Sequence, residues 1–242
     1  MGLNEKFFVP SASGADPAAD PFGDGSCRAF YKLDSDVNDY SGNNLNGSKG
    51  SSVSFSSSGG EYDGFANVTS VNANGIMTFP ITPIPNETHA FWMRKPVMSA
   101  GQTLYLLTVG SGSTDWWSVG MFNDAGTLKM WMQWRQGSAQ YRYTQQNVGI
   151  SVSSTDWFFM TLRTNDNKHY FSLNGGNETE LTSTISAGTM NNSYYTTDNT
   201  NMFVGRNYIN GTNFYGVGFD LDHYRLFNRN LTNTEIDTLY QE

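Results

Sequence analysis

Two glutamates, Glu178 and Glu180, are the nearest match in the sequence to the paired carboxylates of a glycosidase. A retaining glycosidase places its two carboxylates about 5 Å apart, which an alternating spacing along one strand achieves. This pair, however, follows the stretch Asn174–Asn177, whose sequence Asn-Gly-Gly-Asn is typical of a hairpin turn. We therefore interpret the two glutamates as solvated turn residues and not as a catalytic dyad.

The three histidines, His89, His169 and His223, fall in separate predicted strands. They lack the His-x-x-x-His spacing of a zinc site, and no serine elbow accompanies them as in a catalytic triad. Gly110-Ser111-Gly112 also lacks the strand, loop and helix order of a phosphate-binding loop. The sequence predicts that the protein is not an enzyme, and a glycosidase remains the least favoured function.

Aromatic side chains that are not needed in the core could bind a ligand, because sugars lay their apolar faces on exposed rings. Trp117 has the same strand parity as its apolar neighbours and is expected in the core. Trp116 lies at a loop edge, and Trp131 has the parity of Lys129, Gln133 and Arg135. We therefore expect Trp116 and Trp131 to face outward.

The predicted ligand-binding patch combines these two tryptophans with polar and aromatic neighbours. It consists of Trp116, Trp131, Arg135, Tyr141 and Tyr143. The alternative is that an aromatic residue on the outer face packs beneath a loop or against another copy of the chain.

Short stretches of alternating apolar and polar residues, separated by turn sequences, predict many strands. We expect strands over 29–33, 88–93, 103–109, 117–121, 128–135, 157–163, 168–173, 202–205 and 216–227. One helix follows, over Asn233–Tyr240, because Thr232 and Glu235 form a capping box and Leu231 and Ile236 occupy the positions of a hydrophobic staple. This order predicts an all-β, two-sheet antiparallel jelly-roll sandwich with one short C-terminal helix.

Two segments resemble the laminin-G-like, concanavalin A-like jelly rolls. AFYKLDSDVNDYSGNNLNG (29–47) is similar to their first strand and loop, and DLDHYRLFNRNLTNTEIDTLY (220–240) to their last strand and helix. THAFWMRKP, TDWFFMTLRTNDNKHYFSLNG and NMFVGRN resemble strands between them. The resemblance covers residues 27–242 and implies the fold alone, because this fold hosts lectins, adhesion modules, glycosidases and structural domains.

The resemblance also implies a calcium ion near the loop after the first strand. Asp39 occupies the position of the family's loop acid, with Asp34, Asp36 and Asn38 beside it. Calcium would be held through oxygen ligands. The alternative is a network of Asx turns without a metal.

Asp222 is the second residue of this expected site. It shares strand parity with Tyr224 and Leu226, which predicts that its carboxylate points toward the core. A buried carboxylate needs a partner, and we expect the Asp39 loop to supply it, with or without calcium. His223 stands where relatives often carry a second acid, which weakens the case for a metal.

The composition argues against nucleic acid and membranes as partners. The chain has 242 residues and a net charge of −8, with only 14 Lys and Arg. No basic stripe is available for nucleic acid, and no apolar run is long enough to span a membrane. Asn, Ser, Thr and Gly together make up about two residues in five. Cys27 is the only cysteine, so an intrachain disulfide is excluded.

Residues 1–26 are expected to form an extended arm before the jelly-roll domain at 27–242. Phe7, Phe8 and Val9 form its one apolar cluster and are the expected assembly contact. The remainder is rich in Ser, Ala, Gly, Asp and Pro, with too little apolar surface to offset its ordering entropy.

An N-terminus without the apolar core of a signal peptide, joined to this fold, favours a bacteriophage virion protein made in the host cytoplasm. We expect a head-decoration or tail component that binds other virion proteins through its arm and contacts cell-surface glycans through its domain. The sequence leaves a homo-oligomer open. The main alternative is an extracellular carbohydrate-binding or adhesion module.

Overall fold

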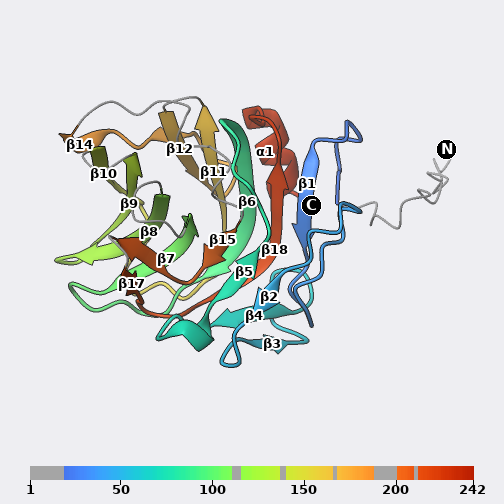
Figure 1. Ribbon diagram of the computed structural model, residues 1–242, viewed down its shortest axis with the longest axis horizontal. Coiled ribbons are helices and arrows are strands. Elements are labelled where there is room, and N and C mark those ends of the chain that lie inside the picture. The colour runs from blue at the N-terminus through green and yellow to red at the C-terminus, as the bar shows by residue number, and fades with distance from the viewer. Residues whose placement is uncertain (1–18, 111–115, 137–139, 166–167, 188–200, 210–211) are drawn as a thin grey trace, which may run out of the picture.

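The computed structural model describes residues 19–110, 116–136, 140–165, 168–187, 201–209 and 212–242. These residues form two antiparallel sheets, a short two-stranded sheet and one helix near the C-terminus (Figure 1). The predicted β-sandwich is therefore confirmed. Among the described residues, no helix has the length and apolar character needed to cross a membrane.

The first sheet has the strand order β13-β12-β11-β6-β18-β4-β3, and β1 also pairs with β18. Its strands are β1 (Cys27–Tyr31), β3 (Ser54–Ser56), β4 (Phe65–Val68), β6 (Asn86–Arg94), β11 (Phe158–Asn165), β12 (Lys168–Leu173), β13 (Thr179–Glu180) and β18 (Phe219–Phe227). The last strand of the sandwich thus lies in the interior of this sheet.

The second sheet has the order β14-β10-β9-β8-β7-β15-β5-β2. Its strands are β2 (Ser48–Lys49), β5 (Met77–Phe79), β7 (Thr103–Val109), β8 (Trp116–Asp124), β9 (Thr127–Gln136), β10 (Gln140–Asn147), β14 (Ser183–Ala187) and β15 (Met202–Val204). The short sheet is β16 (Asn207–Ile209) with β17 (Thr212–Phe214), and one 3₁₀ turn, η1, spans Ala73–Gly75.

The main core fills the space between the two sheets. Alternate residues of each strand point into it, such as Phe91 and Met93 of β6 and Trp117 and Val119 of β8. Burying each side chain of this size contributes roughly 1.5–3 kcal/mol to stability. The period-2 pattern of the sequence therefore identified the inward face of β8 correctly.

A second apolar cluster covers the outer face of the first sheet. Helix α1 (Asn233–Tyr240) lies beside β1 and β18 in Figure 1 and packs Ile236 and Leu239 into this cluster. The predicted capping box is present between Thr232 and Glu235. Hydrogen bonding by Arg229 lowers the pKa of Glu235 to about 2, which keeps the cap charged.

Residues 19–26, which we expected in the arm, also lie against this face. Ala19 is buried, and the ring of Phe22 lies 5.6 Å from that of Phe227. Asp24 forms an ion pair with Arg229 at 2.7 Å. Phe7, Phe8 and Val9 lie outside the described residues.

The expectation that Trp116 and Trp131 form an exposed patch is wrong. Each side chain is only 3% exposed. Strand parity correctly placed Trp131 on the outer face of the sheet, since its neighbours Met130 and Met132 point into the core. That face is covered, however, and the ring of Trp131 meets Tyr105 edge to face at 5.7 Å. The alternative of packing beneath a loop describes the structure better.

The segment that follows β15 lies on this outer face of the second sheet. β16 lies against β7 and β8, and Asn207 donates a hydrogen bond to Gln133 at 3.4 Å. Beneath it, Gly120 makes room for the indole, since an added Cβ would lie 2.8 Å from the Trp131 ring. Parity predicts which face a side chain occupies, but not what returns over that face.

Replacing Trp131 by Ala should therefore lower the free energy of unfolding by about 3–5 kcal/mol, the usual cost of deleting a buried indole. Denaturant titration measures this. Lys129→Ala is the control on the same strand and face; its half-buried ion pair with Asp124 should cost about 1 kcal/mol or less. Equal stabilities for the two variants would show that Trp131 is exposed in solution.

Candidate functional site

A β-bulge in β18 determines where its polar side chains lie. The register with β6 shifts between Asp222 and Arg225, and His223 has a left-handed φ of 46°, which is uncommon for a residue other than glycine. Leu221 before the bulge and Tyr224 after it both face the core between the sheets. Asp222 thus points to the outer face, and the expectation that it shares the face of Tyr224 is wrong.

The Asp222 carboxylate holds the loop between β3 and β4. Its Oδ2 accepts hydrogen bonds from the backbone N–H groups of Glu61 at 2.9 Å and Tyr62 at 3.2 Å. Asp34 accepts a third, from the Gly64 N–H at 3.0 Å. We call Asp34 and Asp222 the carboxylate anchor, because together they fix residues 61–64 onto the sheet.

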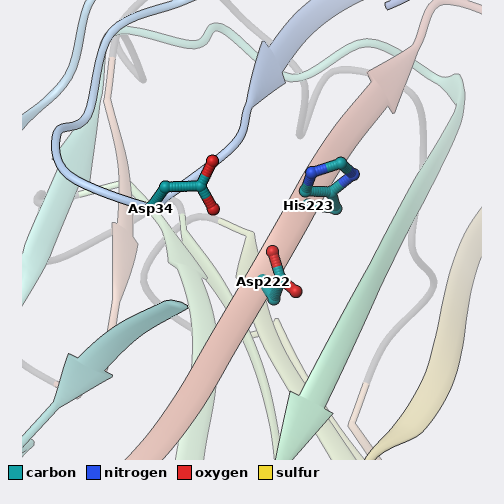
Figure 2. Close-up of side chains that lie close together, drawn as sticks. All are labelled: Asp34, Asp222 and His223. Carbon is teal, nitrogen blue, oxygen red and sulfur yellow. The ribbon is translucent and has the colours of Figure 1, made fainter. Parts of the chain in front are cut away.

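Figure 2 shows Asp34, Asp222 and His223 grouped at this point, and one polar atom from each lies within 4.8 Å of the others. Asp222 is fully buried, and its Oδ1 makes no hydrogen bond among the described residues. Burial raises the pKa of Asp222 to about 7, and the nearby charge of Asp34 adds to this, whereas the amides of Tyr62 and Glu61 oppose it. Asp222 therefore exchanges a proton near neutral pH.

Asp39 does not take part in this group. Its Oδ1 accepts from the backbone N–H of Phe30 at 3.0 Å and of Ser41 at 2.9 Å, and its Oδ2 from that of Leu45 at 2.9 Å. The loop acid is thus satisfied by backbone amides, as the alternative of an Asx-turn network expected. Asp34, and not Asp39, is the carboxylate beside Asp222.

The residues present do not fit the calcium ion that the resemblance implied. Calcium takes about six to eight oxygen ligands. Both oxygens of Asp39 accept amides, as do one oxygen of Asp34 and one of Asp222. The third member of the group, His223, would offer a nitrogen. The carboxylate anchor is better suited to holding a proton.

The anchored loop forms one wall of a pocket of about 400 Å³ on the outer side of the first sheet. We call it the aromatic pocket. It is lined by Glu61, Tyr62, Trp92, Tyr240, Gln241 and Glu242. The loop, β6 and the end of α1 therefore each contribute one aromatic ring.

The rings of the aromatic pocket are held by stacking on neighbouring rings. Trp92 is 7% exposed and stacks with Tyr240 at 5.7 Å and 30°. Tyr62 stacks on His223 at 4.1 Å and 15°. Tyr62 and Tyr240 remain half-buried, so part of each ring faces the pocket. Tyr62 and Tyr240 thus offer partly exposed rings beside the nearly buried Trp92, within a mostly polar lining.

Polar groups surround these rings. Glu61, Gln241 and Glu242 are exposed, and Glu242 pairs with Arg225 at 2.8 Å. Burial raises the pKa of the Tyr62 phenol, and the charge of Glu242 raises it further. The phenol therefore stays neutral at physiological pH and can donate a hydrogen bond.

A second open pocket, of about 390 Å³, lies near the end of β6, and we call it the polar pocket. It is lined by Asn67, Arg94, Lys95, Pro96, Thr155, Gly218, Phe219 and Asp220. Arg94 lies over the rings of Phe65 and Trp157, at 4.9 and 4.8 Å. It also forms an ion pair with Asp220 at 2.7 Å, so these groups already satisfy one another.

The remaining residues of the predicted patch lie on the second sheet. Arg135 pairs through the backbone with Trp116 on one side and Tyr141 on the other, and Tyr143 pairs with Gln133. The side chains of Arg135, Tyr141 and Tyr143 are outside the described residues.

Sequence reasoning missed all three rings of the aromatic pocket. The alternation over 88–93 could have placed Trp92 on the outer face, and the helix prediction could have placed Tyr240 at the helix end. No signal in the sequence pointed to Tyr62, which reaches the pocket only through the carboxylate anchor.

Comparison with known proteins identifies solved structures of the same fold. No protein-family model and no curated protein matches the sequence. Domain 4 of AbnA, an extracellular GH43 arabinanase from Geobacillus stearothermophilus solved with arabinotriose, has a TM-score of 0.61 at 15% identity, over 89% of this chain and 98% of that one.

Clostridial toxin domains are similar over the same part of the chain. The binding domain of Paraclostridial Mosquitocidal Protein 1 has a TM-score of 0.60 at 18% identity and covers 89% of this chain. Botulinum neurotoxin type C, which depends on interaction with two ganglioside molecules to enter cells, has a TM-score of 0.65 at 14% identity and 89% coverage. This chain spans about half of each toxin structure, 52% and 51%. These similarities show the fold, a β-sandwich shared with binding domains.

The raised pKa of Asp222 predicts how stability depends on pH. Because the folded pKa of about 7 exceeds the ordinary value of 3.8, the stability linked to this group is complete below pH 3.8 and is lost as pH rises through 7. Asp222→Asn keeps an oxygen for the loop amides and removes the charge. It should be more stable than wild type at pH 8, by roughly 2–4 kcal/mol, and nearly equal at pH 4.

Asp222→Ala is the matched control, because it removes both the charge and the acceptor. It should be less stable than Asp222→Asn at both pH values, by about 1–3 kcal/mol, since two loop amides lose their partner. Thermal melts with and without a calcium chelator complete the test. If the chelator lowers the melting temperature of wild type but not that of Asp222→Asn, the anchor holds a metal ion and not a proton.

Proposed function

We propose that the protein is a non-catalytic carbohydrate-binding module and that the aromatic pocket holds the sugar. The observation that carries the proposal is the convergence of Tyr62, Trp92 and Tyr240 on one pocket, with Glu61, Gln241 and Glu242 at its rim. Aromatic rings accept the apolar face of a pyranose or furanose, and carboxylate and amide groups accept and donate hydrogen bonds to its hydroxyls.

The comparisons support this function over the virion role favoured by the sequence. The similar arabinanase domain was solved with arabinotriose, and the similar botulinum neurotoxin type C depends on gangliosides for cell entry. The aromatic pocket gives this chain a site of suitable chemistry. Because the identities are at most 18%, the sugar itself is inferred from the pocket and not from these proteins.

The aromatic pocket is a better sugar site than the polar pocket. Neither Phe65 nor Trp157 lines the polar pocket, and the Arg94 guanidinium covers both rings. The Asp220 carboxylate there already accepts hydrogen bonds from Arg94 and Asn67. A sugar would have to displace these interactions, whereas the carboxylate of Glu61 is exposed at the rim of the aromatic pocket.

A glycosidase function gains no support from the predicted pair of glutamates. Glu178 forms an ion pair with Arg163, and Glu180 with Lys168. Each carboxylate is thus paired with its own cation on the first sheet. We therefore propose binding without hydrolysis.

A place in a virion stays a prediction. Its basis is an analogy with phage virion proteins that carry such a domain behind an extended arm. The expected contact, Phe7, Phe8 and Val9, lies outside the described residues. A carbohydrate-binding domain attached through such an arm would contact cell-surface glycans from the particle. Copurification with intact particles would test this role, independently of sugar binding.

Replacing Tyr62 by Ala should weaken binding of oligosaccharides by about tenfold or more, because it removes one aromatic wall while keeping the backbone N–H that Asp222 holds. A glycan array would identify the ligand, and titration calorimetry would compare the variants.

Phe214→Ala is the matched control, because Phe214 is an aromatic residue of β17, 40% exposed, away from the pocket. It should bind as wild type does. If Tyr62→Ala keeps full affinity while Arg94→Ala loses it, the polar pocket is the site.

A further inference from the structure

The charges around the aromatic pocket are mostly negative. Glu61 and Glu242 line it, whereas Asp222 behind Tyr62 is neutral at mildly acidic pH because burial raises its pKa to about 7. The cation Arg225, which acts on Tyr62, already pairs with Glu242. The carboxylate of Glu61 has no ion pair within the described part of the chain. A ligand therefore meets at least one uncompensated negative charge beside the aromatic rings.

Aromatic rings next to a carboxylate form a favourable site for an organic cation. The face of a tryptophan or tyrosine attracts an ammonium group through its quadrupole, and a carboxylate adds a charge-assisted hydrogen bond. The same surface disfavours an anion, because neither lysine nor arginine lines the pocket. The overall charge of −8 acts in the same direction at longer range.

From this geometry we infer that the aromatic pocket selects sugars bearing a free amino group and rejects acidic sugars, with Glu61 as the residue that determines the selectivity. The inference rests on the proposed carbohydrate function and names its ligand class. The apolar face of the amino sugar lies on Tyr62 and Tyr240, and its ammonium group lies at the rim beside Glu61.

The test compares three soluble ligands of equal length by calorimetry: oligomers of glucosamine, of N-acetylglucosamine and of a uronic acid. At mildly acidic pH the amine is charged, and the glucosamine oligomer should bind about fivefold more tightly than its acetylated counterpart, the usual effect of one exposed charged contact. The uronic acid oligomer should bind most weakly. At alkaline pH, where the amine is neutral, the ratio of the first two affinities should approach one.

Glu61→Gln keeps the size of the side chain and removes its charge, so it should reduce that ratio to near one. Asp124→Asn is the matched control, because it makes the same change at the β8–β9 hairpin of the other sheet and should leave the ratio as in wild type.

The selectivity would be overturned, with carbohydrate binding intact, if wild type bound the glucosamine and N-acetylglucosamine oligomers equally. A ratio of these two affinities that Glu61→Gln leaves unchanged would overturn it too. Preference for the uronic acid would overturn it as well. If none of the three oligomers binds and the glycan array is also negative, the carbohydrate function itself fails. Binding of phosphocholine with no binding of any sugar would reassign the pocket to an ammonium headgroup and overturn the inference.

Discussion

The bulge at His223 is the constraint on which the outer face of the first sheet depends. By shifting the register of β18 against β6, it returns Tyr224 to the core, although Asp222 two residues earlier points to the outer face. Asp222 accepts hydrogen bonds from the backbone N–H groups of residues 61 and 62, and the His223 ring stacks on Tyr62. One irregular residue, next to the carboxylate anchor, thus supplies the backing of the aromatic pocket. The left-handed conformation of His223 is energetically unfavourable in isolation, and bulges of this kind are often found beside functional sites.

Local patterns in the sequence predicted the elements well, because their causes are local. The strand over 103–109 and the helix over 233–240 follow from side-chain alternation and from the Thr232 capping box, and the structure has both with these bounds. Trp131 and Asp222 could not be placed in the same way. Trp131 shares its face with Gln133, and the segment over Gln133 comes from Asn207, 74 positions later in the chain. The face of Asp222 was inferred from Tyr224 and Leu226, which lie beyond the bulge, and strict alternation fails across a bulge.

The candidate site illustrates the same limit. Its residues come from the 61–62 loop, from β6 and from the end of α1, and no spacing in the sequence connects them. They meet because α1 packs on the outer face of the first sheet and because two buried carboxylates hold the loop opposite it. On the second sheet, where the sequence placed the ligand-binding patch, Trp116 and Trp131 are instead buried.

The position of β18 has a consequence for how the chain folds. It is the last strand of the sandwich in sequence, yet it lies between β6 and β4 and also pairs with β1. During synthesis, the first sheet lacks an interior strand until residues 219–227 have left the ribosome. The edges of β6 and β4 stay unpaired for that interval, and pairing β1 with β18 closes a loop of nearly the whole domain. Such non-local closure is slow and leaves edges open to association until β18 is in place.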